Sequence, residues 1–464
     1  MTAWRQIPPR ASSKAGKNME YIVNTPCGAL KGVKTRIDGI IAYKGIRYAT
    51  AGRFEYPKQV CSWEGVYDAG EYGACCYQPR SFYDEEKNEK KYFYYNEFRK
   101  GEKYEYSEDC LFLNVFAPEG ASGSLPVIIY IHGGGFTGGC GHEKHFDVPC
   151  WPRLGVIGVT INYRLGPLGF AVLPELAEEA GRCGNYGLYD QLCAIKWVKD
   201  NISAFGGDPD NITIMGQSAG AMSVQQHCLS PLTRGLFQRA VMCSGGGVSK
   251  ILAAKPAEKS YGFWKMIMEK CGAETLSELR EIPVEKLFGV WQENKKAMMG
   301  GGCAPCIDGE LVVGASHSLL NEKKQHEIPY MIGTTSEDML PPVLYSMAKG
   351  WCKKQSSAAY LWFFNRHLPG DDHGAWHSAD LWYWFGTLDN CWRPFDLKDT
   401  KLAEEMSGRL CAFAKGSDPN IDGYEKWDSG GNRALILGDG ESKLGNPSKT
   451  KLWVTMLTNK APGE

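Results

Sequence analysis

The chain has 464 residues, which is long enough for one large domain with insertions or for two or three ordinary domains. Its formal net charge is only −1, with 43% hydrophobic and 23% charged residues, a composition typical of a globular protein. The sequence has no cluster of basic residues of the kind that binds nucleic acid. No stretch approaches the roughly 20 apolar residues that cross a bilayer. We therefore expect neither a nucleic-acid partner nor a membrane partner.

The first segment, residues 1–18, carries Arg5, Arg10, Lys14 and Lys17 but no apolar run. A secretory signal needs an apolar segment of roughly 7–15 residues, so we expect a disordered leader or an alternative start at Met19, and a cytoplasmic location. The chain contains 17 cysteines, an odd number, which we expect to be mostly thiols used as small apolar residues. No repeat or low-complexity linker divides residues 19–464, so they are predicted to form one domain with insertions.

Two insertions stand out along that domain. The segment at about 80–106 mixes many aromatic residues with many charged ones. It is compatible with a solvated helix or surface loop, and equally with a mobile flap that covers a substrate pocket. The segment at about 250–320 is helical and irregular in pattern, and it predicts a helical lid. Before both insertions, short apolar runs at 21–33 and 40–48 predict antiparallel strands.

The remaining pattern alternates strands and helices. Apolar runs of strand length lie at 110–116, 126–132, 155–162, 212–215, 239–244 and 329–333. Strands that are apolar on both faces belong to the middle of a parallel sheet. Helical spacing of apolar residues over 188–202 places a helix between two of them. The sequence therefore predicts an α/β fold, a mostly parallel central sheet flanked by helices.

A short glycine motif carries the chemistry. Gly216-Gln-Ser218-Ala-Gly220 follows one of these strands and opens a helical run. The pattern alone is weak, but a strand, a tight turn and a helix around it are typical of a nucleophile elbow. The flanking glycines relieve crowding in the turn, and the helix start directs backbone N–H groups towards the serine. Ser218 is therefore the candidate nucleophile.

A serine nucleophile needs a base and an orienting carboxylate, which follow it in the order acid then histidine in this arrangement. His377 and its neighbour His373 are the candidate bases, whereas His227 lies in the helix after the elbow and is expected to point away. Glu337 and Asp338 follow the strand at 329–333, and because they are adjacent, spacing does not choose between them.

The oxyanion of the intermediate needs hydrogen-bond donors. His132-Gly-Gly-Gly135 follows a strand, so the N–H groups of Gly134, Gly135 and Ala219 are the predicted donors. This chemistry uses no cofactor. A metal site is not expected: Cys303-Ala-Pro-Cys306 has no second pair, and His142-Glu-Lys-His145 is one residue short of the HExxH spacing.

These residues resemble the type-B carboxylesterase/lipase family, which includes the cholinesterases. The motifs that carry the resemblance are Phe205-Gly-Gly-Asp-Pro-Asp-Asn-Ile-Thr-Ile-Met-Gly-Gln-Ser-Ala-Gly220, Glu108-Asp-Cys-Leu-Phe-Leu-Asn114, Asn162-Tyr-Arg-Leu-Gly-Pro-Leu-Gly-Phe170 and Asn185-Tyr-Gly-Leu-Tyr-Asp-Gln191. The likeness runs from about Tyr21 to the C-terminus and is highly specific. It implies an α/β-hydrolase fold and hydrolysis of carboxylic esters, in a chain of bacterial type.

The resemblance also selects among the candidate residues. The family's acid position falls on Asp338, although many members carry glutamate there, so Glu337 remains the alternative acid. The family histidine precedes a small residue and then an acidic one, which fits His377 and not His373. Secreted members bridge the cysteines equivalent to Cys76 and Cys110, which we expect to be thiols here. Cholinesterases carry glutamate where this chain has Gln217, which argues against a choline ester.

The resulting hypothesis is a serine carboxylesterase that acts on a small-molecule ester through an acyl-enzyme, as a monomer or weak homo-oligomer. Short-chain or aryl esters are suggested by the aromatic residues that flank the histidine, which core packing explains about as well. These are Trp376, Trp382, Trp384 and Phe385. The alternatives are a non-catalytic binding or adhesion protein on the same fold, and an amide or thioester hydrolase.

Overall fold

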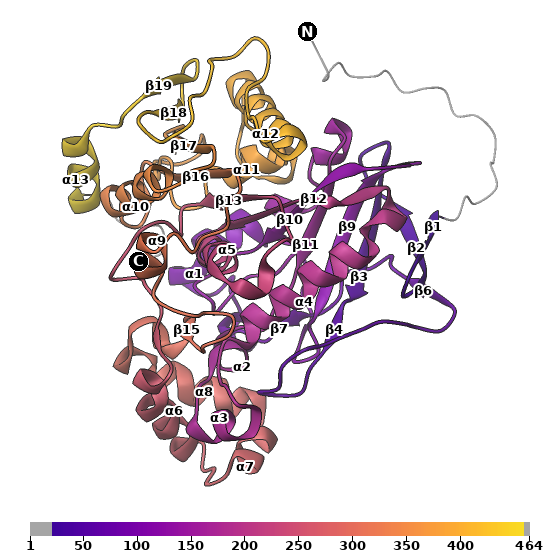
Figure 1. The fold of residues 1–464 in the computed structure, drawn as a ribbon, viewed down its shortest axis with the longest axis vertical. Coiled ribbons are helices and arrows are strands. Elements are labelled where there is room, and N and C mark those ends of the chain that lie inside the picture. Colours follow the sequence, from indigo (N-terminus) through magenta and orange to yellow (C-terminus); the bar gives the residue numbers. More distant parts are fainter. Residues whose placement is uncertain (1–20, 459–464) are drawn as a thin grey trace.

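The computed structural model describes residues 21–458, so the predicted leader at residues 1–18 lies outside the described part. Among the described residues, a 13-stranded sheet crosses the molecule (Figure 1). Its strands are β1 (Tyr21–Thr25), β2 (Gly28–Lys34), β3 (Ile40–Arg47), β6 (Val66–Asp68), β9 (Phe112–Pro118), β10 (Leu125–Ile131), β11 (Ile157–Ile161), β12 (Gly207–Gln217), β13 (Arg239–Cys243), β16 (Tyr330–Thr335), β17 (Ala359–Phe364), β18 (Ala434–Leu437) and β19 (Lys443–Gly445). The strand runs predicted from the sequence are all found in this sheet.

The middle of the sheet is parallel and its two ends are antiparallel. The order is β1-β2-β3-β9-β11-β10-β12-β13-β16-β17-β18-β19, and the pairs from β11 to β18 are parallel. One expectation was wrong: β9, predicted as a parallel strand from its apolar run at 110–116, pairs antiparallel with both β3 and β11. A strand is apolar on both faces when it is covered by helices on both sides of the sheet, whether it runs parallel or antiparallel to its neighbours.

Helices cover both faces of the sheet, so the hydrophobic core has two parts. Along β10, Val127, Ile129 and Ile131 belong to one buried cluster, and Ile128 and Tyr130 belong to the other. Alternate side chains of a strand point to opposite faces, which explains this division. The first cluster includes α4 (Tyr186–Asn201) and α5 (Ala219–Leu229); the second includes α11 (Leu381–Phe385) and α12 (Leu397–Gly416).

The predicted helical region at 250–320 includes the helices α6, α7 and α8, which form the lower part of the molecule in Figure 1. It contains α6 (Glu258–Lys270), α7 (Leu276–Glu281), α8 (Val284–Asn294) and α9 (Ser316–Asn321), with the short strands β14 (Lys255–Pro256) and β15 (Cys306–Ile307) pairing beside them. Helix α7 begins at a capping box in which Thr275 accepts from the N–H of Glu278. The other α-helices are α1 (Glu89–Phe98), α2 (Gly166–Phe170), α3 (Pro174–Ala180), α10 (Pro341–Lys353) and α13 (Lys449–Thr458).

The aromatic and charged segment at 80–106 is held at both ends. It contains η1 (Pro79–Phe82), α1 and the start of β8 (Tyr106–Ser107), which pairs with β7 (Cys75–Cys76). Arg80 and Arg99 both contact the buried carboxylate of Glu143, at 2.5 and 3.2 Å. Glu97 pairs with Arg393 at 2.6 Å, with both side chains fully buried. Helix α1 is therefore packed into the molecule and is not a freely solvated helix.

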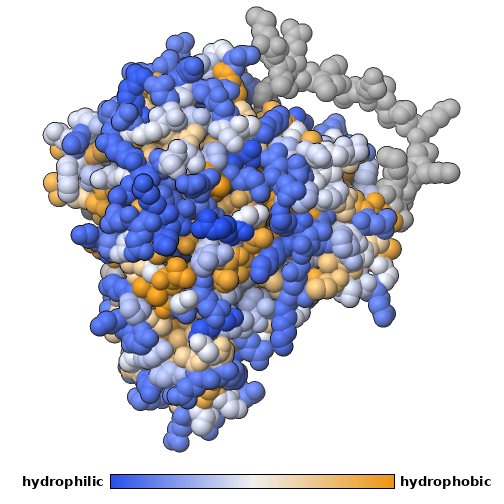
Figure 2. All heavy atoms as spheres, viewed as in Figure 1, coloured by the Kyte–Doolittle hydropathy of each residue, from blue (hydrophilic) through white to orange (hydrophobic). Residues whose placement is uncertain are grey.

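Most of the surface is hydrophilic. Figure 2 shows hydrophobic residues gathered near the centre of this face, above the region of α6 to α8. No helix in residues 21–458 is both long enough and apolar enough to span a bilayer. All 17 cysteines are unpaired, including Cys76 and Cys110, as expected.

Candidate active site

Ser218 stands in a strained turn between β12 and α5. Its backbone has φ 55° and ψ −122°, a combination that a residue with a side chain rarely adopts. A Cβ at Gly216 would lie 2.4 Å from the carbonyl carbon of Gly220, and a Cβ at Gly220 would lie 2.0 Å from the oxygen of Ile131. Both glycines are therefore required for the turn to close against β10. The predicted strand–turn–helix is present.

A buried acid and base face each other beside this turn. Asp338 follows β16, and its Oδ1 lies 2.5 Å from Nδ1 of His377. Its other oxygen, Oδ2, accepts from the hydroxyls of Thr334 at 2.7 Å and Thr335 at 3.1 Å, and the N–H of Met339 donates to Oδ1 at 2.8 Å. Burial opposes ionisation of Asp338, but His377 and these hydrogen bonds outweigh it and hold the pKa of Asp338 at about 2. Asp338 is therefore a carboxylate at neutral pH.

The same pairing acts on His377. Burial disfavours its charged form, but the charge and hydrogen bond of Asp338, with a smaller contribution from the charge of Asp380, raise the pKa of His377 above its usual value. Because Nδ1 donates to Asp338, Nε2 carries the free lone pair of the neutral ring. The ring can thus accept a proton at Nε2, and the resulting imidazolium is stabilised by the carboxylate behind it.

The Nε2 atom of His377 lies 3.0 Å from the amide nitrogen of Gln217, the residue that precedes Ser218. With the lone pair at Nε2, the amide donates this hydrogen bond. Gln217 therefore occupies the position on the imidazole that a serine hydroxyl would need. From the sequence, Gln217 was expected only to argue against a choline ester, and this contact was not predicted. The two threonine hydroxyls on Asp338 were also missed, although Thr334-Thr335 stands at the end of the strand.

The competing residues face elsewhere. Glu337 accepts from the N–H of Ala375 at 2.9 Å and lies 3.5 Å from His367. The His373 ring packs against Phe93, with the ring centroids 4.7 Å apart. His227 contacts the Oε1 of Gln191 at 3.0 Å within the core, pointing away as predicted. The structure therefore brings Asp338 and His377 together, and not the alternatives.

The glycine loop after β10 lies against the elbow. A Cβ at Gly133 would come within 3.0 Å of the Ser218 Cβ, so the two turns are in close contact. Gly134 has φ +113° and Gly135 has φ +63°, and a Cβ at Gly134 would lie 2.2 Å from the oxygen of Gly138. Ala219 is the first residue of α5, where N–H groups have no partner within the helix. The three predicted donor residues therefore belong to two adjoining turns.

The aromatic residues near His377 belong to the core. Trp376, Trp382, Trp384 and Phe385 are all fully buried. Their rings pack with other large side chains in the second core cluster, including Trp151 and Phe98. Of the two explanations left open by the sequence, core packing accounts for these aromatic residues, because their apolar surface is already buried by the protein itself. The exposed apolar side chains nearest to the acid in the sequence are instead those of Met339 and Leu340, which directly follow Asp338.

The chain is similar to known carboxylesterases. The model of the Carboxylesterase family matches residues 19–358, a range that includes Ser218 and Asp338 but ends before His377. The para-nitrobenzyl esterase of Bacillus subtilis is 37% identical over 464 aligned residues, which cover 86% of this chain and 91% of that protein.

Two solved structures are also similar. A structure described as a PNB esterase superposes with a TM-score of 0.80 at 27% identity, covering 94% of this chain and 99% of that chain. A carboxylesterase of Geobacillus stearothermophilus superposes with a TM-score of 0.76 at 26% identity, covering 94% and 99%. The fold is thus that of the α/β-hydrolases. The chain belongs to the carboxylesterase family and is a serine hydrolase of carboxylic esters.

Proposed function

We propose that Ser218, His377 and Asp338 form the catalytic triad of this esterase. The observation that carries the proposal is the buried Asp338–His377 pair, 2.5 Å apart, beside a strained serine turn. Ser218 Oγ attacks the ester carbonyl while His377 Nε2 takes its proton, and Asp338 stabilises the imidazolium. The imidazolium then protonates the leaving alcohol, and an acyl-enzyme remains. Water, deprotonated by His377, releases the acid.

The N–H groups of Gly134, Gly135 and Ala219 hold the oxyanion in both steps. Before the first step, His377 must exchange its hydrogen bond with Gln217 for one with the Ser218 hydroxyl. Gln217 in this way keeps the imidazole in its Nε2-unprotonated form until a substrate brings the serine into reach. The reaction needs no cofactor.

Short-chain and aryl esters are the proposed substrates. Support comes from the similarity to a para-nitrobenzyl esterase and from the exposed apolar side chains of Met339 and Leu340 beside the acid. The segment at 80–106 and the helical region at 250–320 are proposed to frame the pocket as flap and lid of one domain. The enzyme is proposed to be a bacterial, cytoplasmic monomer or weak homo-oligomer, a location that suits 17 unpaired cysteines.

The test is kcat/KM on p-nitrophenyl acetate, butyrate and octanoate for the wild type and for Ser218→Ala. The variant is expected to lose about 10⁴-fold or more, and the short esters are expected to be preferred. A matched series with the corresponding p-nitroanilides and thioesters separates an esterase from an amide or thioester hydrolase. A folded wild type that turns over none of these compounds would contradict the proposal and favour a binding role.

A further inference from the structure

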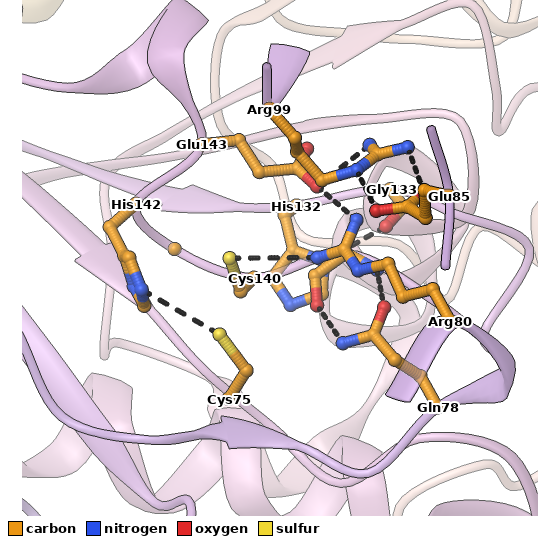
Figure 3. A network of polar contacts seen from close by, with 12 residues as sticks. Cys75, Gln78, Arg80, Glu85, Arg99, His132, Gly133, Cys140, His142 and Glu143 are labelled. Carbon is orange, nitrogen blue, oxygen red and sulfur yellow. Dashed lines mark hydrogen bonds and ion pairs between the residues drawn. The ribbon is translucent and has the colours of Figure 1, made fainter. Parts of the chain in front are cut away.

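Three side chains that the esterase reaction does not use converge behind the glycine loop. They are Cys75 in β7, and Cys140 and His142 in the loop that leads away from Gly133 (Figure 3). One ligand atom from each lies within 4.8 Å of the other two, and Cys75 Sγ is 3.6 Å from His142 Nε2. Cys75 and Cys140 are 0% and 1% exposed. Two sulfurs and one imidazole nitrogen at this spacing form a recognised ligand set for zinc.

The histidine is held in place by its neighbours. Its ring stacks on Tyr72, with the centroids 4.5 Å apart and the planes 7° apart, and the Tyr72 hydroxyl in turn donates to Asp147. A ring fixed on one face cannot rotate away from the two sulfurs without losing that stacking. Such support around a ligand is what metal sites use to orient their histidines.

A route from solvent reaches the cluster. A surface cavity of about 790 Å³ is lined by His142, Tyr72 and Tyr104, together with the acidic residues Glu71, Glu102 and Glu105. The phenol oxygen of Tyr104 is buried and has no hydrogen-bond partner among the described residues, although its ring lies only 5.4 Å from the His142 ring. The fourth coordination position of a tetrahedral site with three protein ligands is open to a water molecule from this cavity.

The charges around the cluster are balanced. Arg80 lies 3.8 Å from Cys140 Sγ, but it is paired with Glu143, and the second arginine on Glu143, Arg99, is paired with Glu85. Two arginines and two glutamates thus cancel, as Figure 3 shows. A divalent cation with two thiolates is itself neutral, so this buried place can hold it without an uncompensated charge.

We propose that Cys75, Cys140 and His142 bind one zinc ion, which ties β7 to the loop that follows Gly133–Gly139. Binding displaces the protons of the two thiols, so two protons leave for each Zn²⁺ bound, and His142 contributes the lone pair of Nε2. Gln78 already joins the same two segments, since it accepts from the N–H of Gly139 at 2.8 Å and donates to its carbonyl at 3.1 Å. The ion adds a second clamp behind the loop that carries Gly134 and Gly135.

The test starts from full-length protein that has been reduced, treated with a chelator and dialysed. Titration with Zn²⁺ is expected to give one ion per chain by elemental mass spectrometry, a higher Tm and the release of about two protons per ion in weak buffer. Replacement by Co²⁺ is expected to give the visible bands of a tetrahedral site and a thiolate-to-cobalt charge-transfer band. Cys140→Ser and His142→Ala are expected to lose the ion and the shift in Tm, whereas Cys61→Ser, which changes an exposed cysteine, retains both.

Several outcomes overturn the proposal. They are a wild type that binds well below one Zn²⁺ per chain, a Co²⁺ spectrum without thiolate bands, or equal binding by Cys140→Ser. A Cys75–Cys140 disulfide found by mass spectrometry after thiols are trapped in the cell also overturns it. The cobalt spectrum and proton release are measured on the wild type, so they decide the question even where a variant fails to fold. None of these readouts depends on esterase activity.

Discussion

The nucleophile elbow and the buried ion-pair network around Glu143 differ in how they are built. At the elbow, the residues that form the turn lie within five positions of one another, from Gly216 to Gly220, and their identities dictate its geometry. In the network, Arg80 and Arg99 come from the two ends of the segment at 80–106, and they meet Glu143, which lies about 40 residues further along the chain, in a buried contact. The first region has a local code and the second does not. We therefore expect changes at the active site to lower the rate of the reaction, and changes in the network to lower the free energy of unfolding.

The sharpest test of this contrast compares two adjacent acids. Asp338→Asn is expected to lower kcat by about 10⁴-fold, because the amide no longer stabilises the imidazolium or fixes its tautomer. Glu337→Gln is the matched control, and we expect a loss below about tenfold, because the carboxylate of Glu337 contacts the Ser336 hydroxyl, the N–H of Ala375 and the His367 ring rather than His377. Both variants are assayed on p-nitrophenyl butyrate with thermal unfolding as a check on folding. Equal losses would contradict the assignment of Asp338.

The network is expected to respond in the opposite way. Glu143→Gln leaves two buried arginines without their shared carboxylate, which lowers the free energy of unfolding by about 3–5 kcal/mol. The control is Glu86→Gln on the exposed surface of the same segment, expected within about 0.5 kcal/mol of the wild type. Urea unfolding followed by fluorescence measures both. If Glu143→Gln unfolds like the control, the network does not anchor the segment at 80–106.

The smallest effect concerns Gln217 and is seen only in a pH profile. Gln217→Glu places a carboxylate beside Nε2 of His377 and raises the pKa of the imidazole further. A general base works only when it is unprotonated, so activity is lost as pH falls through its pKa. A higher pKa therefore moves the acid limb of kcat/KM upward, by about one pH unit. Gln355→Glu adds the same charge elsewhere and is expected to leave the limb in place. An unmoved limb in Gln217→Glu would exclude the contact.

The sequence predicted those parts of the molecule whose code is local. The apolar runs located the strands, the glycines located both turns, and the Thr-Thr-Ser-Glu-Asp segment narrowed the acid to two neighbours. Spacing alone could not choose between Glu337 and Asp338, and only the family resemblance favoured Asp338, because which of two adjacent side chains turns inward depends on the loop that carries His377. Nor could it give the direction of β9, since burial is the same in both directions.

The cluster of Cys75, Cys140 and His142 could not be predicted from the sequence either, because its members meet only in the folded chain. Cys75 and His142 are far apart in the chain, and neither lies in a recognisable ligand spacing. The isolated histidine pair at His142 and His145 was considered as a metal motif and set aside, while the actual neighbours of His142 are two cysteines. Only the pairing of β7 with β8 and the path of the glycine loop bring them together.

The proposed mechanism depends above all on Ser218 as the residue that attacks the substrate. The most direct measurement is labelling with a fluorophosphonate, which phosphonylates an activated serine with loss of fluoride, followed by peptide mass spectrometry. One adduct per chain is expected, located on Ser218, and none in Ser218→Ala under the same conditions. An adduct on another serine, or undiminished labelling of the variant, would contradict it.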